Sequence, residues 1–502
     1  MRTMRARCML QIYGTAALEA AIYVYGFRLG TGEAATLAVA LLFSGITPEQ
    51  KMAAARAAGS VGICSFTVRI RSAAQFLRFF THMLRYLFCC SVFLLMALRV
   101  EAARLLIPMD AGQKAHLKAY GLAYWALAGG AEVDWLLNYR GGSFLFNHTA
   151  EAEAECRIRG IGYEVISEAN ANAVLATISN PEVNMEAVKL LKVPKIAVYS
   201  PKSKQPWDDA VTLVLTYAEI PYDVIFDDEV LQGKLLTYDW LHLHHEDFTG
   251  QYGKFWAGFQ QAAWYREQVA EAEGIAARNG YRTVRELKLA VAQRIRDFTS
   301  GGGFLFAMCS ATDTYDIALA AASTDVCQEM FDGTPADPQA SAKLDFTQCF
   351  AFHNFQVELN PYVYEHSSID VNPVARRVTE QTDLFTLFDY SAKWDVIPAM
   401  LCQNHTRTIK GFMGQTTAFK KDLVKPGVTV MGENAILGEA RYIHGEFGKG
   451  TWTFYGGHDP EDYQHMVGDP PTDLALHPNS PGYRLILNNI LFPAAKPKKR
   501  KT

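Results

Sequence analysis

Residues 301–312 read GGGFLFAMCSAT, in which an uninterrupted apolar run leads from a glycine-rich start into Cys309. The run 303–308 is typical of a strand that is buried on both faces of a sheet. Helix-forming residues follow Cys309, which gives the strand–turn–helix order of a nucleophile elbow. We therefore expect Cys309 at the carboxyl edge of a parallel sheet, near a helix N-terminus that favours the thiolate. The alternative is an inert cysteine that ends a core strand.

The segments around this strand predict the rest of an α/β sheet. Strands are expected at 196–199, 222–226 and 240–243, and helices at 208–219 and across 256–298. This alternation of strands and helices is typical of parallel strands covered by helices. A hairpin is predicted at 440–447 and 451–455 and a closing helix at 483–491, whereas residues 325–440 are irregular and are interpreted as an insertion.

The chain divides by pattern into several parts. A first α/β unit is predicted at 103–192, with strands at 105–107, 133–139 and 161–166 and a helix at 113–128. The main α/β domain is predicted at 195–495. The basic tail 496–502 (KPKKRKT) is expected to be disordered.

Residues 83–102 have the three-part pattern of a secretory signal peptide. A short basic start (MLRY) precedes the apolar run 87–98, and Val100 and Ala102 occupy the −3 and −1 positions of a cleavage site. The run is shorter than the roughly 20 residues that span a bilayer. The sequence therefore predicts a periplasmic or secreted protein that begins at Ala103. Residues 1–82 are interpreted as upstream sequence translated by mistake or, alternatively, as a membrane-proximal extension.

Composition excludes several classes of protein. The chain has 502 residues, 49% of them apolar, and a net charge of −4, so a general nucleic-acid binder is not expected. Residues 103–502 contain an odd number of cysteines without zinc-finger spacing: Cys156, Cys309, Cys327, Cys349 and Cys402. An odd number in an exported chain leaves at least one free thiol.

A base for Cys309 is predicted just past the hairpin, in the stretch YGGHDPED at 455–462. His458 follows a strand end there, and Glu461 is close enough in sequence to orient its ring. Backbone N–H groups around Ser310 would stabilise an oxyanion. The alternative is an ordinary turn rich in Gly, Asp and Pro.

The stretch HLHHED at 242–247 suggests a second kind of chemistry. His242 and His244 share one face of a strand and, with Glu246, form a candidate site for a divalent metal. No HExxH spacing supports it. Alternatively, His245 lines a pocket near Cys309 with Tyr252 from the aromatic segment that follows, or the histidines simply end a polar strand.

These motifs resemble those of the class I glutamine amidotransferase-like superfamily, especially its trehalose-utilisation-type (ThuA-like) branch. The resemblance rests on the elbow at Cys309, on GKGTWTFYGGHDPED at 448–462 and on RLILNN at 484–489. It implies a flavodoxin-like parallel sheet and a catalytic set of Cys309, His458 and Glu461, with Asp459 as an insertion in the usual His-Pro-Glu spacing.

The chain from residue 103 onward also resembles exported proteins of Bacteroidetes-type bacteria that carry the label asparagine synthetase B. Segments such as LLIPMD and HLKAYGLAYWAL carry this likeness. A synthetase of that kind needs an N-terminal cysteine and a Ser-Gly-Gly-x-Asp-Ser loop. The expected start is Ala103, and the stretch 300–305 lacks the Asp and the second Ser, so the motifs do not support the label.

Three functions follow as hypotheses. The first is an exported amidotransferase-like hydrolase that acts on an amide or related carbonyl through Cys309. The second is a non-catalytic protein that binds a small molecule or a carbohydrate on the same fold. The third is a metal-dependent hydrolase. No cofactor other than a divalent metal is expected, and no nucleic-acid partner or stable membrane span in the mature chain.

Overall fold

The structure is a computed structural model that describes residues 81, 83–85, 103–371 and 375–495. The chain separates into residues 1–99 and 100–502, and the fold described below belongs to the second unit. Apart from residues 81 and 83–85, the predictions for 1–82 and for the signal peptide lie outside the described residues, as does the prediction for the tail 496–502.

The larger sheet has a parallel centre. Its parallel strands follow the order β7-β6-β8-β9-β15: Asp223–Ile225, Ile196–Tyr199, Trp240–Leu243, Phe304–Met308 and Gly450–Tyr455. Beyond β15 the sheet continues antiparallel through β14 (Glu439–Phe447), β13 (Thr429–Asn434), β10 (Leu384–Leu387) and β11 (Thr408–Lys410), and β12 (Phe419–Lys420) pairs with β14. The chain is therefore an α/β protein with parallel strands, as its sequence predicts.

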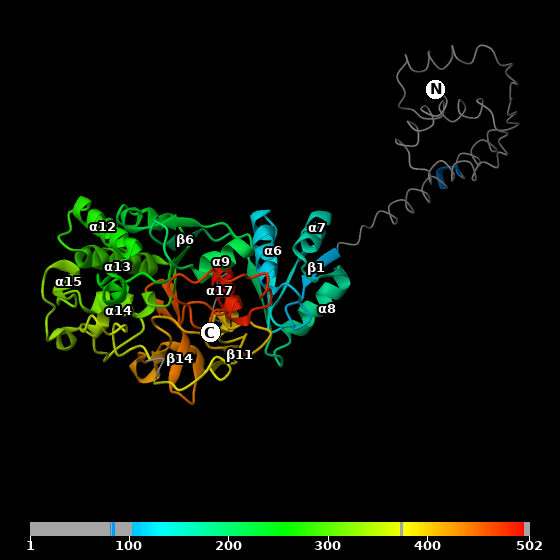
Figure 1. Cartoon of the computed structure of the whole chain (residues 1–502). Helices are drawn as coiled ribbons and strands as arrows, with labels where there is room; N and C mark the ends of the chain where they lie inside the picture. The colour runs from blue at the N-terminus through cyan, green and yellow to red at the C-terminus, as the bar shows by residue number, and fades with distance from the viewer. Residues whose placement is uncertain (1–80, 82, 86–102, 372–374, 496–502) are drawn as a thin grey trace, which may run out of the picture. The chain divides into compact units, whose positions relative to one another are not determined.

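Helices cover both faces of this sheet, and β9 shows how the sequence requires it. Phe306 and Met308 pack into one hydrophobic core, whereas Leu305 and Ala307 pack into a second one. The first core includes α9 (Ala210–Tyr217) and α17 (Pro481–Leu491), and the second includes α12 (Ala263–Arg278), α13 (Val284–Gly301) and α14 (Ala311–Ala320) (Figure 1). Successive side chains of a strand point to opposite faces of the sheet. A strand that is apolar at every position is therefore buried only when both faces are covered by helices.

The first unit forms its own sheet, and all of its strands are antiparallel. They follow the order β4-β1-β3-β2-β5: Glu164–Ser167, Ala103–Ile107, Ser143–Asn147, Val133–Leu137 and Glu186–Leu190. Helices α6 (His116–Ala128), α7 (Ala150–Arg159) and α8 (Glu168–Ser179) accompany it. The sequence pattern located β1, β2, β4 and α6 but not β3 or β5.

The two sheets share one hydrophobic core through α6, which lies beside α9 and α17 (Figure 1). At Gly121 of α6, a Cβ atom would lie 1.8 Å from the carbonyl oxygen of Ala218, so only glycine permits this close approach. Arg484 of α17 is fully buried and donates to the carbonyls of Met109 and Gly141 at 3.1 and 2.8 Å. The first unit is thus tied to the closing helix.

The predicted long helix 256–298 is divided into α11 (Trp256–Phe259), α12 and α13. Gly280 adopts a φ of +81° after α12, and the Thr283 hydroxyl then caps α13 by accepting from the Glu286 N–H. The remaining short helices are α10 (Asp227–Leu231), α15 (Glu329–Asp332) and α16 (Val396–Leu401).

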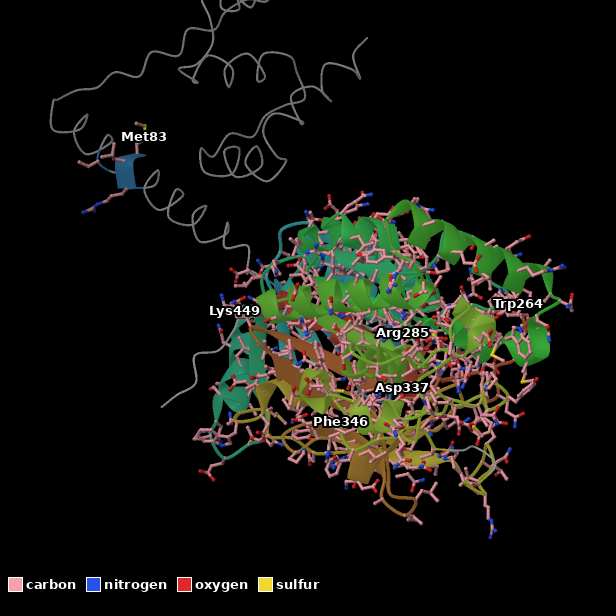
Figure 2. The ribbon with its side chains drawn as sticks, turned by 90° about the vertical axis from the view of Figure 1, so that its left-hand side faces the viewer. Met83, Trp264, Arg285, Asp337, Phe346 and Lys449 are labelled. Carbon is pink, nitrogen blue, oxygen red and sulfur yellow. The ribbon has the colours of Figure 1, made fainter. Side chains whose placement is uncertain are left out.

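Residues 325–440 are mostly loops and short strands, as expected. On the face shown in Figure 2, Arg285 of α13 and Asp337 both contact Thr324, at the start of this region. Arg285 donates to the Thr324 carbonyl, and the Thr324 hydroxyl donates to the Asp337 carboxylate at 3.0 Å. The start of this region is therefore anchored on α13.

Within the described residues, no helix is both long and apolar enough to cross a membrane. The cysteines of residues 103–371 and 375–495 are all free thiols, and all but Cys402 are buried.

Candidate functional site

The carboxyl ends of the parallel strands bring most of the predicted site residues to one edge of the sheet, where open α/β sheets bind ligands. His244 and His245 follow β8, Cys309 follows β9, and His458 lies in the loop after β15. The backbone joins these ends: the Ala311 N–H donates to the His244 carbonyl at 2.9 Å, and the Cys309 N–H donates to the Gly457 carbonyl at 3.1 Å.

Cys309 occupies a sharp turn between β9 and α14. Its φ of +50° lies in the left-handed region, which a non-glycine residue adopts rarely and at a cost. The side chain is buried, and its Sγ accepts a hydrogen bond from the Gln415 N–H at 3.3 Å. Burial raises the pKa of the Cys309 thiol to about 11, although nearby backbone N–H groups lower it. The thiol is therefore protonated at neutral pH.

His458 and Glu461 are not hydrogen-bonded to Cys309 or to each other. Neither ring nitrogen of His458 has a hydrogen-bond partner among the described residues. Glu461 pairs with His477, whose Nδ1 lies 3.1 Å from Glu461 Oε2. The His458 ring instead stacks on His465, with ring centroids 3.9 Å apart. The predicted Cys-His-Glu set therefore shares an edge without forming a hydrogen-bonded triad.

Ser310, Tyr252 and Glu246 lie in two different places. A backbone hydrogen bond from Ser310 lowers the pKa of the Cys309 thiol. Tyr252 and Glu246 both line a small cavity of about 30 Å³, together with Lys288. Burial raises the pKa of Glu246 to about 8, so its carboxyl is largely protonated at neutral pH and is a poor metal ligand. It does not join His242 and His244.

Four histidines and one aspartate converge at the sheet edge, and we call them the histidine cluster: Asp208, His244, His245, His458 and His465. In His244, His245 and His458, one ligand atom of each residue lies within 4.8 Å of the others. The same is true of Asp208, His458 and His465. Rings of His244 and His458 are 4.4 Å apart between centroids.

Most ligand atoms of the cluster are buried and have no hydrogen-bond partner among the described residues. These atoms are both ring nitrogens of His244 and of His458, His245 Nδ1, His465 Nε2 and both carboxylate oxygens of Asp208. Buried polar groups are almost always paired, and an unpaired one costs about 1–3 kcal/mol. Burial, together with the neighbouring histidines, holds the pKa values of His245 and His458 well below the usual range. Both rings are therefore neutral, the form that binds metals.

Asp209 supports the cluster from behind. Its Oδ2 lies 3.1 Å from His242 Nε2 and 3.1 Å from His244 Nδ1, the second contact being off the ideal hydrogen-bond direction. Its Oδ1 accepts from the Thr212 N–H at 2.8 Å and so caps α9. Burial raises the pKa of the Asp209 carboxyl, but the two histidines hold this pKa well below its usual range. His242 thus belongs to this supporting layer, and His244 to the cluster.

Sequence reasoning missed Asp208, Asp209 and His465. The two aspartates were assigned to the start of a helix, although an Asp pair between a strand and a helix is also a typical N-cap with a spare carboxylate. His465 lies seven residues after His458 in the same Asp- and Gly-containing loop. A second histidine in a loop that follows a strand was the signal that could have identified His465 as a site residue.

Aromatic side chains border the cluster at His245. The Trp207 ring meets the His245 ring edge-on, with centroids 5.3 Å apart. Phe255 and Trp264 contact the other sides of Trp207 at 5.1 and 5.2 Å, and Trp264 is marked in Figure 2. A separate cavity of about 440 Å³ lies beside the loop after His458 and is lined by Glu461 and His477 among others.

No family model matches the chain, and no curated protein matches it. Among solved structures, the chain is similar to "Cytoplasmic Protein STM1381 from Salmonella typhimurium LT2", with 13% identity over 60% of this chain and 100% of that one and a TM-score of 0.32. It is also similar to Gan42B, a GH42 β-galactosidase, with 12% identity over 53% of this chain and 28% of that one and a TM-score of 0.23. Likenesses of this strength say nothing about chemistry.

Proposed function

We propose that the protein is a metal-dependent hydrolase whose metal centre is the histidine cluster. The observation that carries this proposal is the convergence of buried ligand atoms that have no partner among the described residues. A bound cation would satisfy several of them, whereas protein hydrogen bonds in the described part of the chain leave them unpaired. The residue types also suit the purpose, because imidazole nitrogens and carboxylate oxygens are common ligands of divalent transition metals.

The set His244, His245 and His458 fits a catalytic rather than a structural ion. Three protein ligands leave a fourth position for water, and a Zn²⁺-type ion lowers the pKa of that water to about 7. Tetrahedral bonds of ~2.0–2.1 Å require ligand atoms about 3.4 Å apart. The ligand atoms already lie within 4.8 Å of one another and would have to approach to that separation on binding an ion. Asp209 would fix the His244 ring so that Nε2 faces the ion.

The reaction class follows from the same geometry. A divalent ion held by these histidines would polarise a carbonyl group and lower the pKa of a bound water, so amides, esters and related carbonyl compounds are the expected substrates. The Trp207 side chain beside His245 offers an apolar surface for the part of the substrate next to the reacting bond.

The test is metal analysis of the full chain purified without chelator, followed by hydrolysis assays on a panel of amides and esters. We expect bound divalent metal and hydrolysis that is lost on chelation and restored by Zn²⁺. His244→Ala should lose both, whereas the control His148→Ala, outside the cluster, should keep both. An unmetallated protein that also fails to bind added Zn²⁺ would refute the proposal.

We also propose that the larger sheet is flavodoxin-like and that the chain is related to the amidotransferase-like superfamily. Numbered along the chain, the parallel strands β6, β7, β8, β9 and β15 lie in the spatial order 2-1-3-4-5. That order is characteristic of flavodoxin-like sheets. It supports the resemblance noted in the motifs, and a crystal structure compared with members of the superfamily would test it.

A second candidate function is hydrolysis of an amide through Cys309. The left-handed φ of Cys309 and the backbone N–H groups at its sulfur favour it, because elbow nucleophiles have both features. The test is an electrophilic glutamine analogue, read by peptide mass spectrometry with Cys309→Ala as control. Selective labelling of Cys309 supports this candidate, and labelling that is absent or spread over several thiols refutes it.

Export remains part of the proposal. Cleavage after Ala102 would leave β1, which begins at Ala103, intact in the mature protein.

A further inference from the structure

We infer that the histidine cluster holds two metal ions, with the His458 imidazole shared between them. This inference rests on the proposed metal centre and deepens it. One ion lies with His244 and His245, and the other with Asp208 and His465.

The first observation is that the ligand atoms form two groups rather than one. His244, His245 and His458 form one group within 4.8 Å, and Asp208, His458 and His465 form the other. His458 is the member common to both. Its ring contacts a histidine of each group: it stacks on His465 with an interplanar angle of 8° and lies 4.4 Å from His244 between centroids.

The second observation concerns the two ring nitrogens of His458. The residue is 5% exposed, and neither Nδ1 nor Nε2 has a partner among the described residues. One ion can take only one of these nitrogens and would leave the other buried and unpaired. A second ion takes the other nitrogen and displaces its proton, which passes to solvent, so the ring bridges the ions as an imidazolate.

The third observation is that a carboxylate lies behind one histidine of each group. Asp209 Oδ2 lies 3.1 Å from Nδ1 of His244, and Asp462 Oδ2 lies 3.0 Å from Nδ1 of His465. A carboxylate behind each histidine fixes the ring and leaves Nε2 for a metal. His465 Nε2 is buried without a partner, as this arrangement requires.

The second group also carries the negative charge that a second cation needs. Both carboxylate oxygens of Asp208 are buried and unpaired in the described structure, and Asp208 Oδ1 lies 3.6 Å from His465 Nδ1. The first group consists of histidines alone and contains no carboxylate. Two adjacent cations repel each other, and the carboxylate together with the imidazolate offsets that repulsion.

Two ions would divide the work of hydrolysis. The ion at the all-histidine group would hold the attacking hydroxide, and the ion at Asp208 would polarise the carbonyl oxygen of the substrate.

The test is a Co²⁺ and Zn²⁺ titration of the chelator-stripped full chain. We expect two equivalents per chain, with one equivalent retained in His245→Ala and one in Asp208→Ala, and two in the control His148→Ala. A limit of one equivalent in the unmodified chain overturns the two-ion inference and leaves the proposed function standing. A limit of zero overturns both.

A second measurement tests the shared ring independently of stoichiometry. Cu²⁺ is added stepwise, and its electron paramagnetic resonance signal is integrated. An imidazolate bridge couples the two ions, so the second equivalent should reduce the low-temperature signal rather than double it. A signal that simply doubles overturns the sharing of His458.

Discussion

Asp209 Oδ2 lies 3.1 Å from His244 Nδ1, and the same oxygen lies 3.1 Å from His242 Nε2. One carboxylate thus positions a histidine of the cluster and a histidine behind it, while its other oxygen caps α9. The loop after β6 is thereby joined to the end of β8. The side chain of His244 cannot rotate without breaking this contact, which preorganises the candidate metal centre before any ion binds.

Replacing Asp209 should weaken metal binding without unfolding the protein. Asparagine remains a good N-cap for α9, so Asp209→Asn keeps the capping bond but loses the charge behind His244. We expect a roughly 10–100-fold loss of Zn²⁺ affinity, measured by competition with a chelator. Thr149→Ala is the matched control, because it removes the cap of α7 at 3.0 Å and should lower stability alone. Unchanged affinity in Asp209→Asn would contradict the positioning role.

Cys309 should react slowly with alkylating agents at neutral pH. With a pKa of about 11, the thiolate fraction at pH 7 is roughly 10⁻⁴. Because this pKa is raised, the fraction and the alkylation rate should increase tenfold per pH unit toward pH 11. The measurement is iodoacetamide labelling of the folded chain, with the urea-denatured chain as control. Rapid, selective labelling at pH 7 would favour the cysteine-dependent candidate instead.

Much of the larger sheet is encoded in local pattern. Strands β6 and β8 have the bounds that their apolar runs predict, and β9 differs by one residue. Their carboxyl ends were therefore placed correctly, which is why His245 and His458 were both expected near Cys309. The pattern could not say which way each side chain points. That depends on loop backbone such as the left-handed Cys309, and on partners distant in sequence such as Asp209.

The first unit shows a different limit. The strand predicted at 133–139 ends at Leu137 as β2, and the residues that follow turn the chain into β3, which pairs antiparallel with both β1 and β2. Because β3 was not predicted, the antiparallel pairing of this sheet was not predicted either. Gly141 and Gly142 have φ values of +76° and +88°, typical of a tight turn between strands.

Export can be tested at the level of the mature N-terminus. We expect expression of the full gene in a Gram-negative host to yield a periplasmic or secreted form that begins at Ala103, because Val100 and Ala102 suit signal peptidase. N-terminal sequencing identifies the start. Ala102→Tyr should block processing, whereas Ala103→Ser should not. A mature form that retains residues 83–102 would contradict the prediction.

Glu246 should make the protein less stable as pH rises. Burial raises its pKa to about 8 from an ordinary value of 4.5, so the folded chain holds this proton more tightly than the unfolded chain does. The free energy of unfolding therefore falls between pH 4.5 and about 8 and stays low above that window. Glu246→Gln, which cannot ionise, should match the unmodified chain near pH 4.5 and exceed it by about 4–5 kcal/mol at pH 8.5. Urea unfolding at both pH values measures this, with the exposed Glu182→Gln as control. A variant that gains equally at both pH values would show that the effect lies in packing rather than in the buried charge.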